Sequence, residues 1–181
     1  MKKLSWKQAG VYLPLPVLMA GVWWMCRERL DLFPMLLREI IMVFGYEAAV
    51  WDVREKRVPN QLVLAMLGVW VLVMVPQLFL QTAQTVPILL SGLFGGLLAG
   101  VIFLTVYLVS RHGLGGGDVK FMSAAGLYLG LSGVIPTMLV GSVLAAVTGV
   151  ICILLKKMDR KGTLALIPFL YVGVVLTMFF R

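Results

Sequence analysis

Two aspartates lie at the borders of apolar segments. A charged carboxylate has a high free-energy cost next to the membrane interior, so these residues are candidates for a functional role. Asp118 follows the three glycines of 115–117 and opens a long apolar run, and Asp52 closes an earlier one. Glycines allow the backbone to approach another chain closely. Two carboxyls that face each other share one proton at neutral pH, so one can act as general acid and the other as general base. The pair therefore predicts an aspartic hydrolase that works at a membrane.

The two acids are expected to sit at opposite kinds of helix end. Asp118 is predicted at a helix N-cap, where exposed N–H groups and the helix dipole stabilise an anion. Asp52 is predicted at a helix C-terminus, where the dipole disfavours one. Our hypothesis is that Asp52 holds the proton and acts as acid, while Asp118 activates water. Arg54 and Lys56 lie close enough in sequence to hold Asp52 ionised instead, so the reverse assignment stays open.

The composition is that of an integral membrane protein. Of 181 residues, 61% are hydrophobic and 13% are charged, and the mean hydropathy is +0.99. A soluble domain is about half apolar and a quarter charged. We predict an all-α, polytopic membrane helix bundle that forms one domain over residues 1–181. The net charge of +8 fits an excess of basic residues on the cytoplasmic side better than a nucleic-acid partner.

Seven apolar segments predict six or seven transmembrane helices. The second segment is the weakest, because Arg38, Glu39 and Glu47 interrupt it. The fifth is short: from Asp118 to Leu131 a helix extends only about 21 Å, against a hydrocarbon core of roughly 30 Å. Either it starts inside the membrane boundary, with Asp118 in a recess, or it continues past Gly133. The segments are 9–26, 33–51, 60–80, 86–110, 118–132, 134–155 and 163–180.

Basic residues in alternate connections predict the orientation. They place the amino terminus in the cytoplasm, the carboxyl terminus outside, and Asp52 and Asp118 together on the cytoplasmic face. The stretch 1–30 begins like a secretory signal peptide but lacks a small-residue cleavage pattern, so we read it as an uncleaved anchor. The basic residues that carry this pattern are Lys2, Lys3, Lys7, Arg54, Lys56, Arg57, Arg111, Lys120, Lys156, Lys157, Arg160 and Lys161.

The remaining polar residues predict little chemistry. Cys26 and Cys152 lie far apart in apolar runs and form no CxxC pair, so we expect inert thiols, no metal site and no cofactor. His112 is expected to be a solvated loop residue, and Glu47 to pair with a buried polar group.

Three residues near the aspartates have ordinary structural interpretations. Pro59 and Asn60 are expected to start and cap the third helix. Lys120 is expected to point away from Asp118, as an anchor toward the membrane surface. The tryptophans near segment ends are typical of the membrane interface.

Two motifs resemble the signature segments of type IV prepilin peptidases. In that family an aspartate is followed by basic residues and an (Ile/Val)-Pro-Asn helix start, as in the segment 52–60, and a GxGD motif is followed by a lysine, as in 115–120. The Ile-Pro-Phe of 167–169 is similar to a carboxy-terminal family segment. The resemblance covers about 36–180. It implies a catalytic dyad of Asp52 and Asp118, supported by the motif residues Gly115, Gly117, Lys120, Pro59 and Asn60.

The resemblance also implies a substrate. Members remove short basic leaders from prepilins and pseudopilins at the cytoplasmic membrane face, cutting after a glycine beside the pilin's apolar helix. Many bacterial members carry an insertion with two CxxC pairs and also methylate the new amino terminus. This sequence has two cysteines and neither pair. It therefore resembles the short, peptidase-only members, and cleavage without methylation is expected.

Two other functions remain open. Presenilin-like intramembrane proteases also use GxGD, but their other aspartate lies in a Tyr-Asp motif at mid-helix, whereas Asp52 follows Trp51 and precedes a basic run. A transporter or proton path expects an acid near the bilayer midplane, and here both acids lie at one face. A structural subunit remains possible if the two acids never meet.

Overall fold

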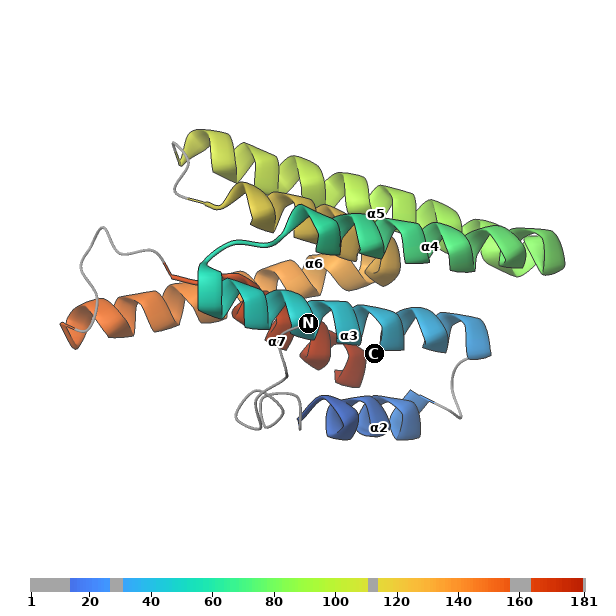
Figure 1. Ribbon diagram of the computed structural model, residues 1–181, viewed down its shortest axis with the longest axis horizontal. Coiled ribbons are helices and arrows are strands. Elements are labelled where there is room, and N and C mark those ends of the chain that lie inside the picture. The colour runs from blue at the N-terminus through green and yellow to red at the C-terminus, as the bar shows by residue number, and fades with distance from the viewer. Residues whose placement is uncertain (1–13, 27–30, 111–113, 157–163, 181) are drawn as a thin grey trace, which may run out of the picture.

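The computed structural model describes residues 14–26, 31–110, 114–156 and 164–180. This part of the chain is a bundle of helices without a strand, as the composition predicts (Figure 1). The helices are α2 (Pro14–Cys26), α3 (Leu32–Glu55), α4 (Asn60–Leu80), α5 (Thr82–Val109), α6 (Gly116–Leu154) and α7 (Ile167–Phe180).

The helix that carries Asp52 is longer than the predicted segment 33–51. Helix α3 continues to Glu55 and ends at Lys56, whose backbone is left-handed with φ of 51°. The N–H of Lys56 donates to the carbonyl of Asp52 at 2.8 Å. Asp52 thus belongs to the last turn of α3, which fixes the position of its backbone. The predicted segment 60–80 is confirmed as α4.

Helix α6 consists of two halves that meet at Gly130. This residue has φ of 66° and ψ of 175°, a backbone conformation that favours glycine. The ribbon reverses its direction there, so the two halves form a hairpin (Figure 1). The N–H of Leu131 donates to Oγ of Ser91 on α5 at 3.1 Å, which satisfies a donor released by the break. The two predicted segments are therefore separate, with the break at Gly130 and not near Gly133.

The hairpin is packed between α5 and α7 through glycines. A Cβ on Gly95 of α5 would lie 2.6 Å from the backbone of Gly130, and one on Gly173 of α7 would lie 2.5 Å from the carbonyl of Thr137. Small residues allow membrane helices to approach this closely. The first half of α6, which begins beside Asp118, is thereby fixed against α5, and the second half is fixed against α7.

Side-chain hydrogen bonds attach α4 to the first half of α6. Nε1 of Trp70 donates to the carbonyl of Leu127 at 3.1 Å, and the hydroxyl of Tyr128 donates to the carbonyl of Met66. Polar atoms within a bilayer need partners inside the protein. These bonds satisfy the donors of Trp70 and Tyr128. They also join α4, the helix after Asp52, to the helix that carries Asp118.

The outer surface of the bundle is apolar. Leu72 on α4 and Leu97 on α5 are 72% and 64% exposed, as expected for side chains that face lipid. Among the described helices, α4, α5 and α6 are long and apolar enough to cross a membrane, and α2 and α7 contain shorter apolar helices. The total of six or seven spans stays a prediction.

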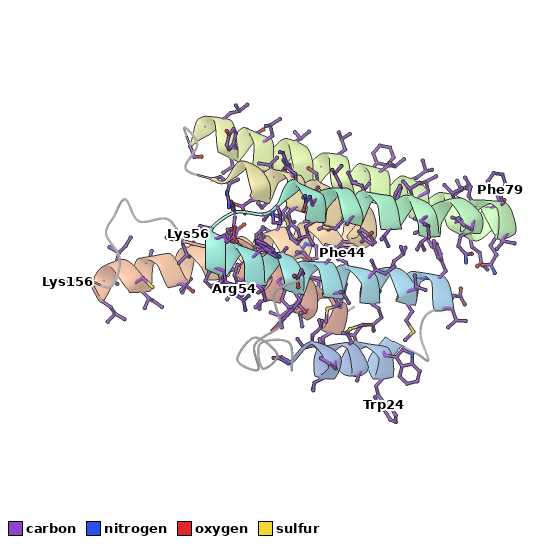
Figure 2. The ribbon with its side chains drawn as sticks, viewed as in Figure 1. Trp24, Phe44, Arg54, Lys56, Phe79 and Lys156 are labelled. Carbon is purple, nitrogen blue, oxygen red and sulfur yellow. The ribbon has the colours of Figure 1, made fainter. Side chains whose placement is uncertain are left out.

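Several basic residues lie at one end of the bundle. Arg54, Lys56 and Lys156 lie toward the end where α3 finishes and α6 starts, whereas Phe79 lies at the opposite end (Figure 2). This distribution agrees with the charge pattern of the sequence for those residues. The basic residues of the amino terminus and of 157–161 lie outside the described part.

Candidate active site

Asp52 and Asp118 are both buried at the same end of the bundle. Their side chains are 5% and 8% exposed, respectively. The charge of Asp52 acts directly on the carboxyl of Asp118, so the two acids from α3 and α6 form one electrostatic unit. A buried pair of carboxyls is the arrangement in which a single proton is shared.

The carboxyl of Asp52 lies at the beginning of α7. The backbone N–H of Ile167, the first residue of that helix, donates to Oδ2 of Asp52 at 3.0 Å. The first N–H groups of a helix have no partner within it and favour an anion. The Ile-Pro-Phe segment thus has a specific contact with the site: its first N–H group binds the first aspartate.

The carboxyl of Asp118 lies in the first turn of its own helix. Gly115 is the N-cap of α6, and its N–H donates to Oδ2 of Asp118 at 3.2 Å. The prediction that Asp118 is itself the N-cap is wrong, because the N-cap, Gly115, lies three residues earlier and the side chain of Asp118 reaches back to it. The favourable helix dipole that was expected for Asp118 is nevertheless present.

These contacts weaken the argument for placing the proton on Asp52. That hypothesis rested on Asp52 being at a helix C-terminus and Asp118 at an N-terminus. In the structure both carboxyls meet a helix N-terminus, that of α7 at Asp52 and that of α6 at Asp118. The positive charge of Lys56 also acts on Asp52. Asp52 still lies in the last turn of α3, but the N-terminus of α7 offsets the unfavourable dipole that the sequence argument used.

The loop between α3 and α4 packs directly against the glycine motif. A Cβ on Gly117 would lie 3.1 Å from the backbone nitrogen of Val58 and 3.2 Å from its Cβ. Lys120 of α6 donates through Nζ to Oδ1 of Asn60 at 3.0 Å. The segments after Asp52 and around Asp118 are thus in contact at two points.

This contact corrects two predictions. Asn60 makes no capping hydrogen bond to α4, whose N-cap is Pro59, because its side chain accepts from Lys120 instead. Lys120 is exposed, but its Nζ donates to Asn60 of α4, so it is bound to another helix and is not a free membrane anchor. Sequence spacing alone contains no signal for this pair.

The other polar residues lie outside this unit. Glu47 accepts a hydrogen bond from Nε1 of Trp51 at 3.2 Å, one turn along α3. Cys152 is a free, partly buried thiol. The described residues contain no cluster of three or more side chains suited to a metal. His112 lies outside the described residues, so its expected position as a solvated loop residue stays a prediction.

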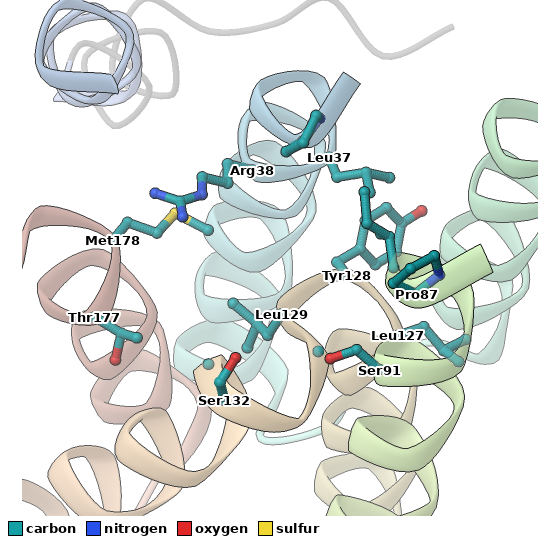
Figure 3. A pocket seen from close by; sticks show the side chains of 14 residues that line it. Leu37, Arg38, Pro87, Ser91, Leu127, Tyr128, Leu129, Ser132, Thr177 and Met178 are labelled. Atoms are coloured by element: carbon teal, nitrogen blue, oxygen red, sulfur yellow. The ribbon is translucent and has the colours of Figure 1, made fainter. Parts of the chain in front are cut away.

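Two cavities flank the α6 hairpin. One of about 310 Å³ lies at the Gly130 break, where Arg38, Ser91, Ser132 and Thr177 are among the residues that line it (Figure 3). The other, of about 420 Å³, lies between α5 and the second half of α6 and extends to Leu114 and Leu166. Neither cavity is lined by Asp52 or Asp118, but the second adjoins residues that hold them.

Comparison with known proteins agrees with the motifs. A sequence model described as the type IV leader peptidase family matches residues 40–150. A "Prepilin leader peptidase/N-methyltransferase" of Xanthomonas campestris pv. campestris is 31% identical over 123 residues, which are 67% of this chain and 42% of that protein. Another with the same description from Bacillus subtilis (strain 168) is 26% identical over 150 residues, 81% of this chain and 55% of that protein.

The chain spans about half the length of these curated relatives. No solved structure matches it. The family match covers more than half of the chain and includes both buried aspartates. The protein therefore belongs to the type IV leader peptidase family.

Proposed function

We propose that this protein is a membrane aspartic endopeptidase that removes the basic leader of a prepilin or pseudopilin. The proposal depends on one observation: Asp52 and Asp118 are buried carboxyls, and each accepts a hydrogen bond from a backbone N–H at the start of a helix. Family membership supplies the class of substrate. Neither a transport path nor a presenilin-like activity is favoured by a specific contact.

In the proposed reaction the dyad acts as one acid and one base. The ionised carboxylate takes a proton from water, whose oxygen attacks the carbonyl carbon of the scissile peptide. The protonated carboxyl donates its proton to the carbonyl oxygen. Collapse of the tetrahedral intermediate breaks the C–N bond. The first carboxyl gives the proton that it took from water to the departing nitrogen, and the second carboxyl takes a proton back from a hydroxyl of the intermediate. Holding both carboxyls within rigid helices keeps them positioned for this sequence without reorganisation.

The site is proposed to face the cytoplasm. Arg54, Lys56 and Lys156 lie at its end of the bundle (Figure 2), and basic residues are enriched on the cytoplasmic side of membrane proteins. A pilin precursor whose apolar helix lies in the bilayer then delivers its scissile bond, after a glycine, to the dyad at the membrane boundary. Its short leader remains on the cytoplasmic side.

We further propose that cleavage is not followed by methylation. The CxxC pairs of the family's methylating members are absent from this sequence, which has two cysteines, Cys26 and Cys152. The curated relatives are described as carrying both activities, but this chain spans only part of their length.

Purified protein in lipid vesicles tests the proposal. It is incubated with a prepilin that has a basic leader, with and without S-adenosylmethionine, and the products are identified by mass spectrometry. We expect one cut after a glycine and an unmethylated mature amino terminus. A substrate that stays intact contradicts the peptidase activity, and a mature product heavier by one methyl group contradicts the second part.

A further inference from the structure

We propose that the apolar helix of the substrate docks in the cavity between α5 and the second half of α6, here called the lateral groove. This inference rests on the proposed peptidase function and adds a place for the part of the substrate that is not cut. The groove has a volume of about 420 Å³ and is lined by Ile102, Phe103, Val106, Leu114, Ile135, Met138, Leu139, Ser142, Val143 and Leu166.

One end of the lateral groove leads to both carboxyls. Leu114 directly precedes Gly115, whose N–H binds Asp118. Leu166 directly precedes Ile167, whose N–H binds Asp52. The two leucines thus stand one residue away from the two groups that hold the dyad. A chain that leaves the groove at this end passes next to the catalytic pair.

The chemistry of the groove selects an apolar occupant. Ser142 is the one polar side chain among those that line it, and none of them is charged. A charged group would lose its hydration there without gaining a partner. The groove therefore suits the apolar helix of a pilin and not its basic leader, so the scissile bond between these two parts comes to lie at the dyad.

The groove is open along the side of the bundle. Leu139 and Val143 on α6 are 63% and 58% exposed, and Val106 on α5 is 47% exposed. From Ile135 to Val143, α6 rises by about 12 Å, which corresponds to roughly two turns of a docked helix. Van der Waals packing between side chains is one of the forces that associate helices in lipid. A helix that diffuses in the bilayer can reach this groove sideways.

Variants that fill the lateral groove distinguish docking of the substrate helix from a general effect on catalysis. The variants Leu139→Trp and Val143→Trp place a bulky ring in it, and Leu72→Trp places the same ring on an exposed position of α4 as the matched control. Each protein is assayed with a full prepilin and with a short peptide that ends soon after the scissile bond. We expect KM for the prepilin to rise at least about tenfold in the groove variants, much more than for the peptide, and to stay at the wild-type value in the control.

A photoreactive benzoyl-phenylalanine at position 139 gives an independent readout. It should cross-link to the apolar helix of the prepilin. Unchanged KM in both groove variants, an equal loss on the two substrates, or cross-links only to lipid or to a second copy of the chain would overturn the inference. A wild-type protein that cleaves neither substrate refutes the proposed function itself. Cleavage by the wild type together with unchanged KM in the groove variants refutes only the docking site.

Discussion

The backbone N–H of Ile167 donates a hydrogen bond of 3.0 Å to Oδ2 of Asp52, although the two residues lie 115 positions apart in the chain. Through this bond the start of α7 acts on a carboxyl at the end of α3. The α6 hairpin packs against α7 and also carries the other acid. The position of Asp52 relative to Asp118 therefore depends on the last helix of the bundle.

Replacing Ile167 by proline tests this bond, because proline has no N–H and is well accepted at the first position of a helix. A hydrogen bond to a charged group is worth about 2 kcal/mol, and if it acts in the transition state its loss lowers kcat/KM roughly 30-fold. The measurement is leader cleavage by the purified variant.

The control for this substitution is Ile167→Ala. The side chain of Ile167 is fully buried, so both variants lose packing and should unfold at lower temperatures. Only the proline variant loses the donor. Equal kcat/KM values for the two variants would show that the N–H group has no part in the reaction.

Gly117 and Gly116 form a matched pair for testing the contact between the two motifs. A Cβ on Gly117 meets Val58 at 3.1 to 3.2 Å, whereas a Cβ on Gly116 has its nearest neighbour, on Tyr107, at 4.0 Å. We expect Gly117→Ala to cost about 1 kcal/mol of stability through overpacking and to reduce cleavage. Gly116→Ala should be neutral or stabilising. Thermal unfolding and cleavage rates check both, and identical behaviour of the two variants would contradict the close approach.

The hydrogen bond between Lys120 and Asn60 is open to a double-mutant cycle. Both side chains are exposed, so the expected coupling free energy is modest, about 1 kcal/mol. Lys120→Met, Asn60→Ala and the double variant are compared by thermal unfolding and by kcat. Effects that simply add would mean that the two residues do not interact.

The break in α6 at Gly130 predicts a loss of stability when this glycine is replaced. Alanine at Gly130 must adopt φ of 66°, and its Cβ would lie 2.6 Å from Oγ of Ser91. A side chain in this backbone region, which is essentially restricted to glycine, costs about 1–3 kcal/mol. Gly149→Ala, where the added Cβ has no neighbour within 4 Å, is the control in the same helix. We expect only Gly130→Ala to lower the unfolding temperature, and a similar loss in both variants would argue against a constrained turn.

Much of the helical framework can be predicted from the sequence, because apolar runs and their polar borders are local features. The segment 60–80 coincides with α4. The break in α6 was expected near Gly133 but lies at Gly130. The choice between these glycines depends on Ser91, which supplies the acceptor from another helix, and no periodicity within the segment contains this information.

In the candidate site, too, some features could be predicted from the sequence and others could not. Asp52 and Asp118 stand out because acids at membrane borders are rare. Their partners do not stand out, since Ile167 acts through its backbone and Lys120 binds Asn60 across the bundle. The hypothesis that Asp52 holds the proton used only the helix of each residue, and it missed the helix that begins against Asp52.

The most direct test of the account is cleavage of a prepilin by Asp52→Asn and Asp118→Asn in lipid vesicles. Glu55→Gln is the matched control, because Glu55 belongs to the last turn of the same helix as Asp52 but pairs with Arg57 at 3.0 Å on the surface. Loss of a general acid or base predicts a fall in kcat of at least roughly 100-fold for each aspartate variant, with the control at the wild-type rate. Wild-type activity in either aspartate variant would contradict the dyad.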